Sequence, residues 1–297
     1  MSPAAPSSTA QLIARGIVFL DADRDIAPLL PPRAAEVSCW FLQDLGVLRS
    51  TRALTRPPFR WVVSLLEQQL LPGIFLHYVL RKRWLEDAVR DAVHDGFKQV
   101  VVLGAGFDTL AVRLQNEFPQ VRFIEVDHPD TQAAKRAALE SRAQVGSNMT
   151  LVGADLASDS LRLRFATDPD FWPAADTMFV AEGVLMYLEE RAVQRLFADI
   201  AELATGRLRI AFSYMETHGD TVRFPDSSRL IDWWLNRRGE IMRWGTPPEH
   251  LGEFVAELGY RLSQTANHDG LRDRYLPNGL LQRPLARGER LALVSRE

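Results

Sequence analysis

Cysteine is almost absent from this chain of 297 residues, since Cys39 is its only example. An intrachain disulfide and a cysteine-cluster metal site are therefore excluded, and we expect Cys39 to be a small buried hydrophobic residue. Long apolar runs are also missing: no segment approaches the roughly 18 uncharged apolar residues of a transmembrane helix. Residues 1–10 are small, polar and proline-containing, which is not typical of a secretory signal. These absences predict a cytoplasmic protein with no metal site and no membrane as a partner.

Strong net charge is missing as well. The net charge is −3, and lysine occurs only at positions 82, 98 and 135, so arginine supplies nearly all of the positive charge. A balance this close to zero gives no reason to expect nucleic acid as a partner. The length and the hydrophobic content of 46% suffice for one large α/β domain with an appendage, or for two small domains. We expect a helical extension or lid at 1–95 and the main domain at 96–297, with a helical insertion at about 222–258.

The clearest pattern in the sequence is a βαβ unit at residues 99–127. An apolar run at 100–103 reads as a buried parallel strand and leads directly into a turn that contains Gly104 and Gly106. Apolar residues at helical spacing follow, and a second strand ends on Asp127, twenty-one residues after Gly106. Glycines let backbone N–H groups approach a nucleotide-like ligand, and an acid about 20 residues further on accepts the hydroxyls of a ribose.

The third glycine of a dinucleotide fingerprint is missing, because Thr109 occupies its position. A dinucleotide needs that glycine for the close helix–strand approach around its pyrophosphate. Its absence favours a ligand that contains a nucleoside but no pyrophosphate. A nicotinamide-dependent oxidoreductase shares the glycine turn and the ribose acid, and it stays open as an alternative.

Acidic residues recur where successive predicted strands end. Asp127 closes the second strand, Asp155 follows the third at 149–153, and Glu182 follows the fourth at 177–181. Each one alone is compatible with an ordinary loop carboxylate. Because the carboxyl ends of parallel strands meet at one edge of a sheet, we expect all three to converge on one crevice beside the glycine turn.

The remaining elements follow from hydrophobic spacing and from proline and glycine breaks. Helices are expected at 34–45, 60–71, 78–95, 129–142, 189–204 and 246–259, and further strands at 208–214, 260–266 and 290–295. Residues 1–10 are expected to be a loose tail. The aromatic segment 224–244, which includes Trp233, Trp234 and Trp244, is expected to be an inserted helical lid over the ligand.

Four of these stretches together resemble one known family. The segments 102–109, 123–129, 153–156 and 181–188 resemble, in the same order, the leucine carboxyl methyltransferase family of class I S-adenosylmethionine-dependent methyltransferases. The resemblance extends over about 78–191. It implies a Rossmann-like seven-stranded sheet whose last strand is antiparallel, an N-terminal helical extension and a helical lid insertion. It also implies S-adenosylmethionine as the cofactor.

The resemblance assigns roles to single residues. Gly104 and Glu182 would line the methionyl part of the cofactor and Asp127 the ribose, while Asp155 and the backbone of Leu156 would read the adenine. Arg81 would pair with the cofactor's carboxylate, with Arg83 as a competing assignment. The full set of expected cofactor-binding residues is Arg81, Gly104, Gly106, Asp108, Asp127, Asp155, Leu156 and Glu182.

The expected reaction is transfer of a methyl group to an oxygen of a small organic or polyketide-type acceptor in secondary metabolism. A carboxylate acceptor is ionised at neutral pH and needs no general base, whereas a phenol or alcohol benefits from one. Tyr187 is expected to line the acceptor pocket, and Tyr214 and His218 are the catalytic candidates beside the fifth strand. Alternatives are a protein C-terminal carboxyl methyltransferase, which belongs to the same family, and a non-enzymatic partner protein that keeps the fold.

Overall fold

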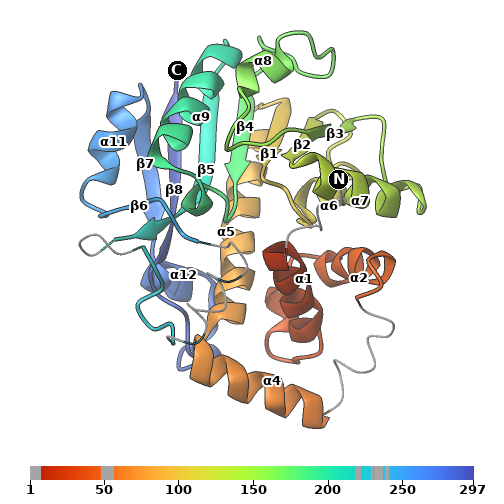
Figure 1. The fold of residues 1–297 in the computed structure, drawn as a ribbon, viewed down its shortest axis with the longest axis vertical. Helices are drawn as coiled ribbons and strands as arrows, with labels where there is room; N and C mark the ends of the chain where they lie inside the picture. Colours follow the sequence, from red (N-terminus) through yellow and green to blue (C-terminus); the bar gives the residue numbers. More distant parts are fainter. Residues whose placement is uncertain (1–7, 48–56, 218–221, 229, 231–236, 238–240) are drawn as a thin grey trace.

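The computed structural model describes residues 8–47, 57–217, 222–228, 230, 237 and 241–297. Its centre is a mixed sheet with strand order β3-β2-β1-β4-β5-β8-β7, and a short strand, β6, pairs with β5 (Figure 1). The strands are β1 Gln99–Leu103, β2 Arg122–Asp127, β3 Met149–Gly153, β4 Thr177–Ala181, β5 Leu208–Glu216, β6 Gly245–Thr246, β7 Arg261–Ala266 and β8 Glu289–Arg296.

The directions of the strands agree with the predicted fold. β1 to β5 run parallel, and β8 lies antiparallel between β5 and β7. The seven-stranded Rossmann-like prediction with an antiparallel last strand is therefore confirmed, with β6 as an added two-residue strand. The strand order reverses between β1 and β4, which are direct neighbours, and this is where open α/β sheets bind their ligands.

Helices cover both faces of the sheet. They are α1 Ser8–Asp21, α2 Ala34–Asp44, α4 Pro57–Leu70, α5 Ile74–His94, α6 Leu110–Leu114, α7 Pro129–Glu140, α8 Leu161–Phe165, α9 Glu190–Leu203, α11 Leu251–Glu257 and α12 His268–Tyr275, with 3-10 turns η1 Ala27–Leu29, η2 Leu185–Tyr187 and η3 Asn278–Leu280. Val100 and Val102 of β1 join the hydrophobic cluster of α1, α2, α5, α6 and α7. Val101 and Leu103 join the cluster of α8, α9 and α11 on the other face. The uninterrupted apolar run of β1 is thus buried on both sides.

The helices of residues 1–95 lie at the end of the sheet toward which the parallel strands point, except that α5 runs back along one face (Figure 1). The side chains of α1, α2 and α5 share one hydrophobic cluster with the strands. The division of the chain near residue 95 stays a prediction. No helix in the described part of the chain is long and apolar enough to span a membrane.

Two expectations about local structure need correction, and a third concerns residues that lie partly outside the described part of the chain. The expected tail at 1–10 overlaps α1, which already begins at Ser8. The helix expected at 246–259 is shorter, because α11 begins at Leu251 after a turn. In the expected lid segment, Trp233 and Trp234 lie outside the described residues, while Trp244 is buried against Phe254.

Candidate functional site

The glycine turn after β1 places backbone directly against the segment that follows β4. Gly104 has a φ of +62°, a conformation that favours glycine. A Cβ atom at this position would lie 2.6 Å from Cγ2 of Val184. Both the backbone conformation and the lack of space therefore require glycine here, and the turn keeps a bare backbone at the carboxyl end of the sheet.

Asp127 holds this turn in place. Its Oδ2 accepts a hydrogen bond from the N–H of Gly106 at 2.7 Å, and its Oδ1 accepts one from the N–H of His128 at 2.7 Å. Burial raises the pKa of the Asp127 carboxyl group, although the two backbone hydrogen bonds act in the opposite direction. Each carboxylate oxygen has a further lone pair, so the group can still accept hydroxyl groups of a ligand.

A cavity of about 180 Å³ lies between this turn, α1, α2, α5 and the segment after β4. Its lining includes the predicted site residues Arg81, Gly104, Gly106, Asp108, Asp127, Glu182 and Tyr187. Asp155 and Leu156 do not line it. The carboxylate of Asp155 instead accepts hydrogen bonds from the N–H of Ala157 and the hydroxyl of Ser158, which closes the turn after β3.

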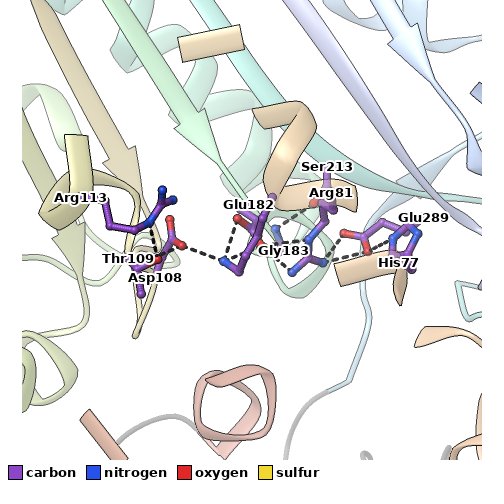
Figure 2. A network of polar contacts seen from close by, with 10 residues as sticks. His77, Arg81, Asp108, Thr109, Arg113, Glu182, Gly183, Ser213 and Glu289 are labelled. Carbon is purple, nitrogen blue, oxygen red and sulfur yellow. Dashed lines mark hydrogen bonds and ion pairs between the residues drawn. The ribbon is translucent and has the colours of Figure 1, made fainter. Parts of the chain in front are cut away.

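A chain of buried charges crosses the site (Figure 2). Nε and Nη2 of Arg81 both donate to Oε1 of Glu182, at 3.0 and 2.8 Å. Nζ of Lys82 donates to Oδ1 of Asp108 at 2.7 Å and to Oε2 of Glu182 at 3.1 Å. Burial alone would raise the pKa of Asp108, but the charges of Lys82, Lys135 and Arg113 and the hydrogen bond from Lys82 together outweigh it, and the pKa lies below its ordinary value. Glu182 therefore bonds both Arg81 and Lys82 of α5.

The chain continues to the C-terminal strand of the sheet. Nη1 of Arg81 donates to both carboxylate oxygens of Glu289, at 2.7 and 2.8 Å, and Nε2 of His77 lies 2.8 Å from Oε2 of Glu289 (Figure 2). Burial would raise the pKa of Glu289, but the charge of Arg81 and the interactions with His77 and Ser213 together outweigh it and lower the pKa to about 2. The same carboxylates raise the pKa of Arg81 against its own burial. Arg81 thus lies between the carboxyl groups of Glu182 and Glu289 and keeps its positive charge.

The two arginines that compete for the cofactor's carboxylate point in different directions. Arg81 lines the cavity, whereas Nη1 of Arg83 lies 3.5 Å from the carbonyl oxygen of Leu29, and its guanidinium group lies over the ring of Tyr275. Since Arg83 is occupied on the far side of α5, the geometry favours Arg81.

A second cavity of about 250 Å³ adjoins the first and is mostly apolar. The two cavities share Thr9, Ile13, Arg81, Gly183 and Tyr187. Its other lining residues come mainly from α4, α5 and the stretches around η2 and before β6: Leu12, Val63, Leu66, Glu67, Leu70, Leu71, Ile74, Phe75, Tyr78, Met186, Phe224, Met242 and Glu289. Burial raises the pKa of Glu67, although a hydrogen bond from the N–H of Phe75 opposes this.

The three residues expected on the acceptor side have different positions. Tyr187 lines both cavities, and its role beside an acceptor stays a prediction. Tyr214 is fully buried in the cluster of α8, α9 and α11 and lines neither cavity, and burial raises its pKa to about 12. Its neighbour Ser213 faces the opposite way, toward the N–H of Gly183. His218 lies outside the described residues.

Sequence reasoning missed His77 and Glu289 as members of the site. His77 stands four residues before Arg81 on α5, so their helical spacing was a usable indication that they share a face. Glu289 stands alone at the start of a strand, and its contact with Arg81 spans 208 residues, so no local pattern points to it. In the described part of the chain, no group of three or more histidine, cysteine, aspartate or glutamate residues could hold a metal ion.

The residues around the first cavity fit a sulfonium nucleoside with an amino-acid tail. The turn at Gly104 offers backbone that a Cβ atom would block, and Asp127 offers a carboxylate to a ribose. Oδ2 of Asp108 is buried without a hydrogen-bond partner among the described residues, which leaves an acceptor for the cofactor's ammonium group. Arg81 lines the same cavity and would supply the cation for the carboxylate of such a ligand.

Comparison with known proteins finds a matching family model and related proteins. The family model for leucine carboxyl methyltransferase matches residues 28–201. A Frankia alni protein is 34% identical over 153 residues, which cover 51% of this chain and 52% of that protein. A Mycolicibacterium smegmatis protein is 35% identical over 201 residues, which cover 65% of each chain. The names of both proteins assign them to the S-adenosyl-L-methionine-dependent methyltransferases.

The matched part of the chain thus spans about half to two thirds of the length of these relatives. Among solved structures, a Thermobifida fusca YX protein assigned as a methyltransferase aligns with a TM-score of 0.54 and 17% identity. The alignment covers 87% of this chain and 93% of that one. At this level of identity the likeness shows a common fold.

Proposed function

Because the chain belongs to the leucine carboxyl methyltransferase family of S-adenosylmethionine-dependent enzymes, we propose that it methylates an oxygen of a small apolar acceptor. One observation carries the proposal: the cavity at the glycine turn adjoins a largely apolar cavity, and Tyr187 and Arg81 line both. A cofactor in the first cavity would thus present its methyl group to a molecule in the second. The family assignment removes the reason to propose a nicotinamide-dependent oxidoreductase.

The residues of the chain would act by binding and orientation. Asp127 would hold the ribose and Arg81 the carboxylate of the cofactor, whereas Asp155 and Leu156, the residues expected at the adenine, do not line this cavity. When bound, S-adenosylmethionine supplies an electrophilic methyl group, whose bond to sulfur breaks as the bond to the acceptor oxygen forms. Orientation of two reactants alone can contribute on the order of 7–11 kcal/mol to such a transfer. The apolar walls of the second cavity would exclude water from the attacking oxygen.

Two acceptor classes are compatible with this arrangement. A carboxylate is already ionised and needs no base, so that positioning by Tyr187 and the cavity walls would suffice. A phenol or alcohol needs a proton acceptor, and Glu67 is an ionisable group of the second cavity whose pKa is raised by burial. Tyr214 is a weak candidate for that task because it lines neither cavity. The size of the cavity favours a small molecule over the C-terminus of a protein.

The test is a transfer assay with methyl-labelled S-adenosylmethionine against apolar carboxylic acids and phenols of increasing length. A peptide that ends in leucine is included to test for protein carboxyl methylation. We expect labelled product with at least one small apolar acceptor. Methyl esters release methanol in mild base and methyl ethers do not, so the product identifies the acceptor class. The proposal fails if the protein binds NAD but not S-adenosylhomocysteine in titration calorimetry.

A further inference from the structure

Glu289 occupies an unusual place for a residue of the last strand. Its carboxylate is fully buried, reaches the edge of the apolar cavity and bonds Arg81 through both oxygens. It lies outside the residues that match the family model. We propose that Glu289 is a positioning residue that fixes the guanidinium group of Arg81 for the carboxylate of the cofactor. This inference rests on the proposed function.

The hydrogen bonds of Arg81 show how it is held. A guanidinium group has five N–H donors in one plane. Nη1 donates to both oxygens of Glu289, while Nε and Nη2 both donate to Oε1 of Glu182. The plane is therefore held from two edges, and the second N–H of Nη2, which has no hydrogen-bond partner in the described part of the chain, can serve a ligand. If the contact with Glu289 is lost, only the edge at Glu182 holds the group, and the guanidinium can rotate about it.

Glu289 is itself well fixed. Nε2 of His77 lies 2.8 Å from Oε2, and the Ser213 hydroxyl is a further hydrogen-bond partner that lowers its pKa. Its backbone is paired with Met215 of β5 in the antiparallel ladder. A carboxylate anchored by a strand and by two side chains cannot follow a moving arginine. The carboxylate of Glu289 is thus suited to fix the position of the Arg81 guanidinium group.

The charges of the cluster are also consistent with this role. Among the described residues, the connected cluster contains two cations, Arg81 and Lys82, and three carboxylates, Asp108, Glu182 and Glu289. The formal charge of these five side chains is −1, which is opposite to that of S-adenosylmethionine, whose sulfonium, ammonium and carboxylate groups sum to +1. A substitution of Glu289 therefore changes both the orientation of the Arg81 guanidinium group and the charge of the cluster. A test must separate these two effects.

The experiment compares two ligands that have no net charge. S-adenosylhomocysteine carries a zwitterionic amino-acid part, whereas 5′-methylthioadenosine has the same nucleoside and sulfur without it. With Glu289→Gln, we expect the dissociation constant of S-adenosylhomocysteine to rise about tenfold or more, as for a misdirected charge-assisted hydrogen bond. The constant for 5′-methylthioadenosine should change less than about twofold. Arg81→Met should show the same selectivity, and the double variant should lose little more than Arg81→Met alone.

Glu86→Gln is the matched control. Glu86 is a buried carboxylate on the same helix and pairs with Arg113 at 2.7 Å, but it lines neither cavity. We expect this variant to bind both ligands like the unmodified protein. If Glu289→Gln does not fold, His77→Phe replaces it, because this change removes the imidazole contact of Glu289 and leaves Arg81 intact.

Two results would overturn the inference: an equal loss for both ligands, which indicates a general structural role, or no loss for either. Both are distinct from a failure of the proposed function, in which the unmodified protein does not bind S-adenosylhomocysteine at all. Selective loss of the ligand that carries the amino-acid part is the result expected only if Glu289 acts through Arg81.

Discussion

Replacement of Asp127 tests the centre of the proposed cofactor site. In Asp127→Ala, the N–H groups of Gly106 and His128 lose their acceptors at 2.7 Å, and a bound ribose loses the carboxylate. A hydrogen bond to a charged group contributes about 1.5–3 kcal/mol, so the loss of two ribose hydroxyl contacts corresponds to roughly 3–6 kcal/mol. We therefore expect the affinity for S-adenosylhomocysteine to fall by at least about a hundredfold.

Asp127→Asn separates the role in the turn from the role in binding. An amide has a single oxygen, so it can replace the acceptor for Gly106 or for His128 but not for both. The variant should keep part of the turn and still bind S-adenosylhomocysteine much more weakly than the unmodified protein. Urea unfolding measures the loss of stability, and titration calorimetry measures the affinity. Because unfolding and binding are measured separately, a loosened turn is not mistaken for a lost ribose contact.

The pH dependence gives an independent check of the same carboxylate. Burial raises the pKa of Asp127, and only the ionised form accepts hydrogen bonds from two hydroxyls as well as two N–H groups. Affinity should therefore be highest above this pKa and fall as the pH is lowered through it. Asp127→Asn should remove that dependence. Asp176→Asn is the control, since Asp176 pairs with Arg207 just before β4, at the opposite end of the sheet. Unchanged affinity in Asp127→Ala would refute the ribose assignment.

Three further predictions concern the turn, the core and the acceptor cavity. Gly104→Ala should destabilise the protein by at least about 1–3 kcal/mol in urea unfolding, because of its positive φ and the contact with Val184; unchanged stability would contradict this. Burial raises the pKa of Glu125 to about 7 against the charge of Lys135, so its contribution to stability should fall by about 3 kcal/mol as the pH rises from about 4.5 to 7. Glu125→Gln should reduce the pH dependence of the free energy of unfolding, measured with urea between pH 5 and 8. If the pH dependence were retained, it would come from another group. Leu70→Phe should fill part of the apolar cavity, so that methyl transfer to long acceptors falls while the affinity for S-adenosylhomocysteine is unchanged. If methyl transfer to short and long acceptors fell equally, the acceptor would bind elsewhere.

The sheet could be predicted because its strands carry their information locally. The run at 100–103 is apolar on both faces, and the turn at Gly104 marks the strand's end without reference to the rest of the chain. Helix α1 could not be recognised in the same way. It has no acidic residue in its first turn and no basic residue in its last turn, so the usual signs of helix ends are missing. Helix α12 has a cap at Asn267 but buries only Leu271, too little for a periodic pattern.

The same distinction applies to the candidate site. Asp127 and Glu182 were predictable because a parallel sheet brings the carboxyl ends of its strands to one edge, whatever the rest of the fold. Asp155 obeys the same rule but closes its own turn instead of lining the cavity. Glu289 depends on a different fact: β8 inserts antiparallel beside β5 and brings its first residue next to α5. That placement follows from the order of the strands and not from any residue near Glu289.

Arg81 lies where the two cavities of the site meet. Its guanidinium group lines the cavity proposed for the cofactor and the cavity proposed for the acceptor, and its two carboxylate partners come from the ends of β4 and β8. The guanidinium group of Arg81 is already paired with a carboxylate on two of its edges. It therefore could not bind the carboxylate of an acidic acceptor and the carboxylate of the cofactor at the same time. Arg81 is the one lysine or arginine among the described residues that line the apolar cavity, so the sulfonium group of the cofactor would supply further positive charge to attract an acidic acceptor. Such a site would bind an acidic acceptor well only when the cofactor still carries its methyl group, which couples the order of binding to the charge of the cofactor.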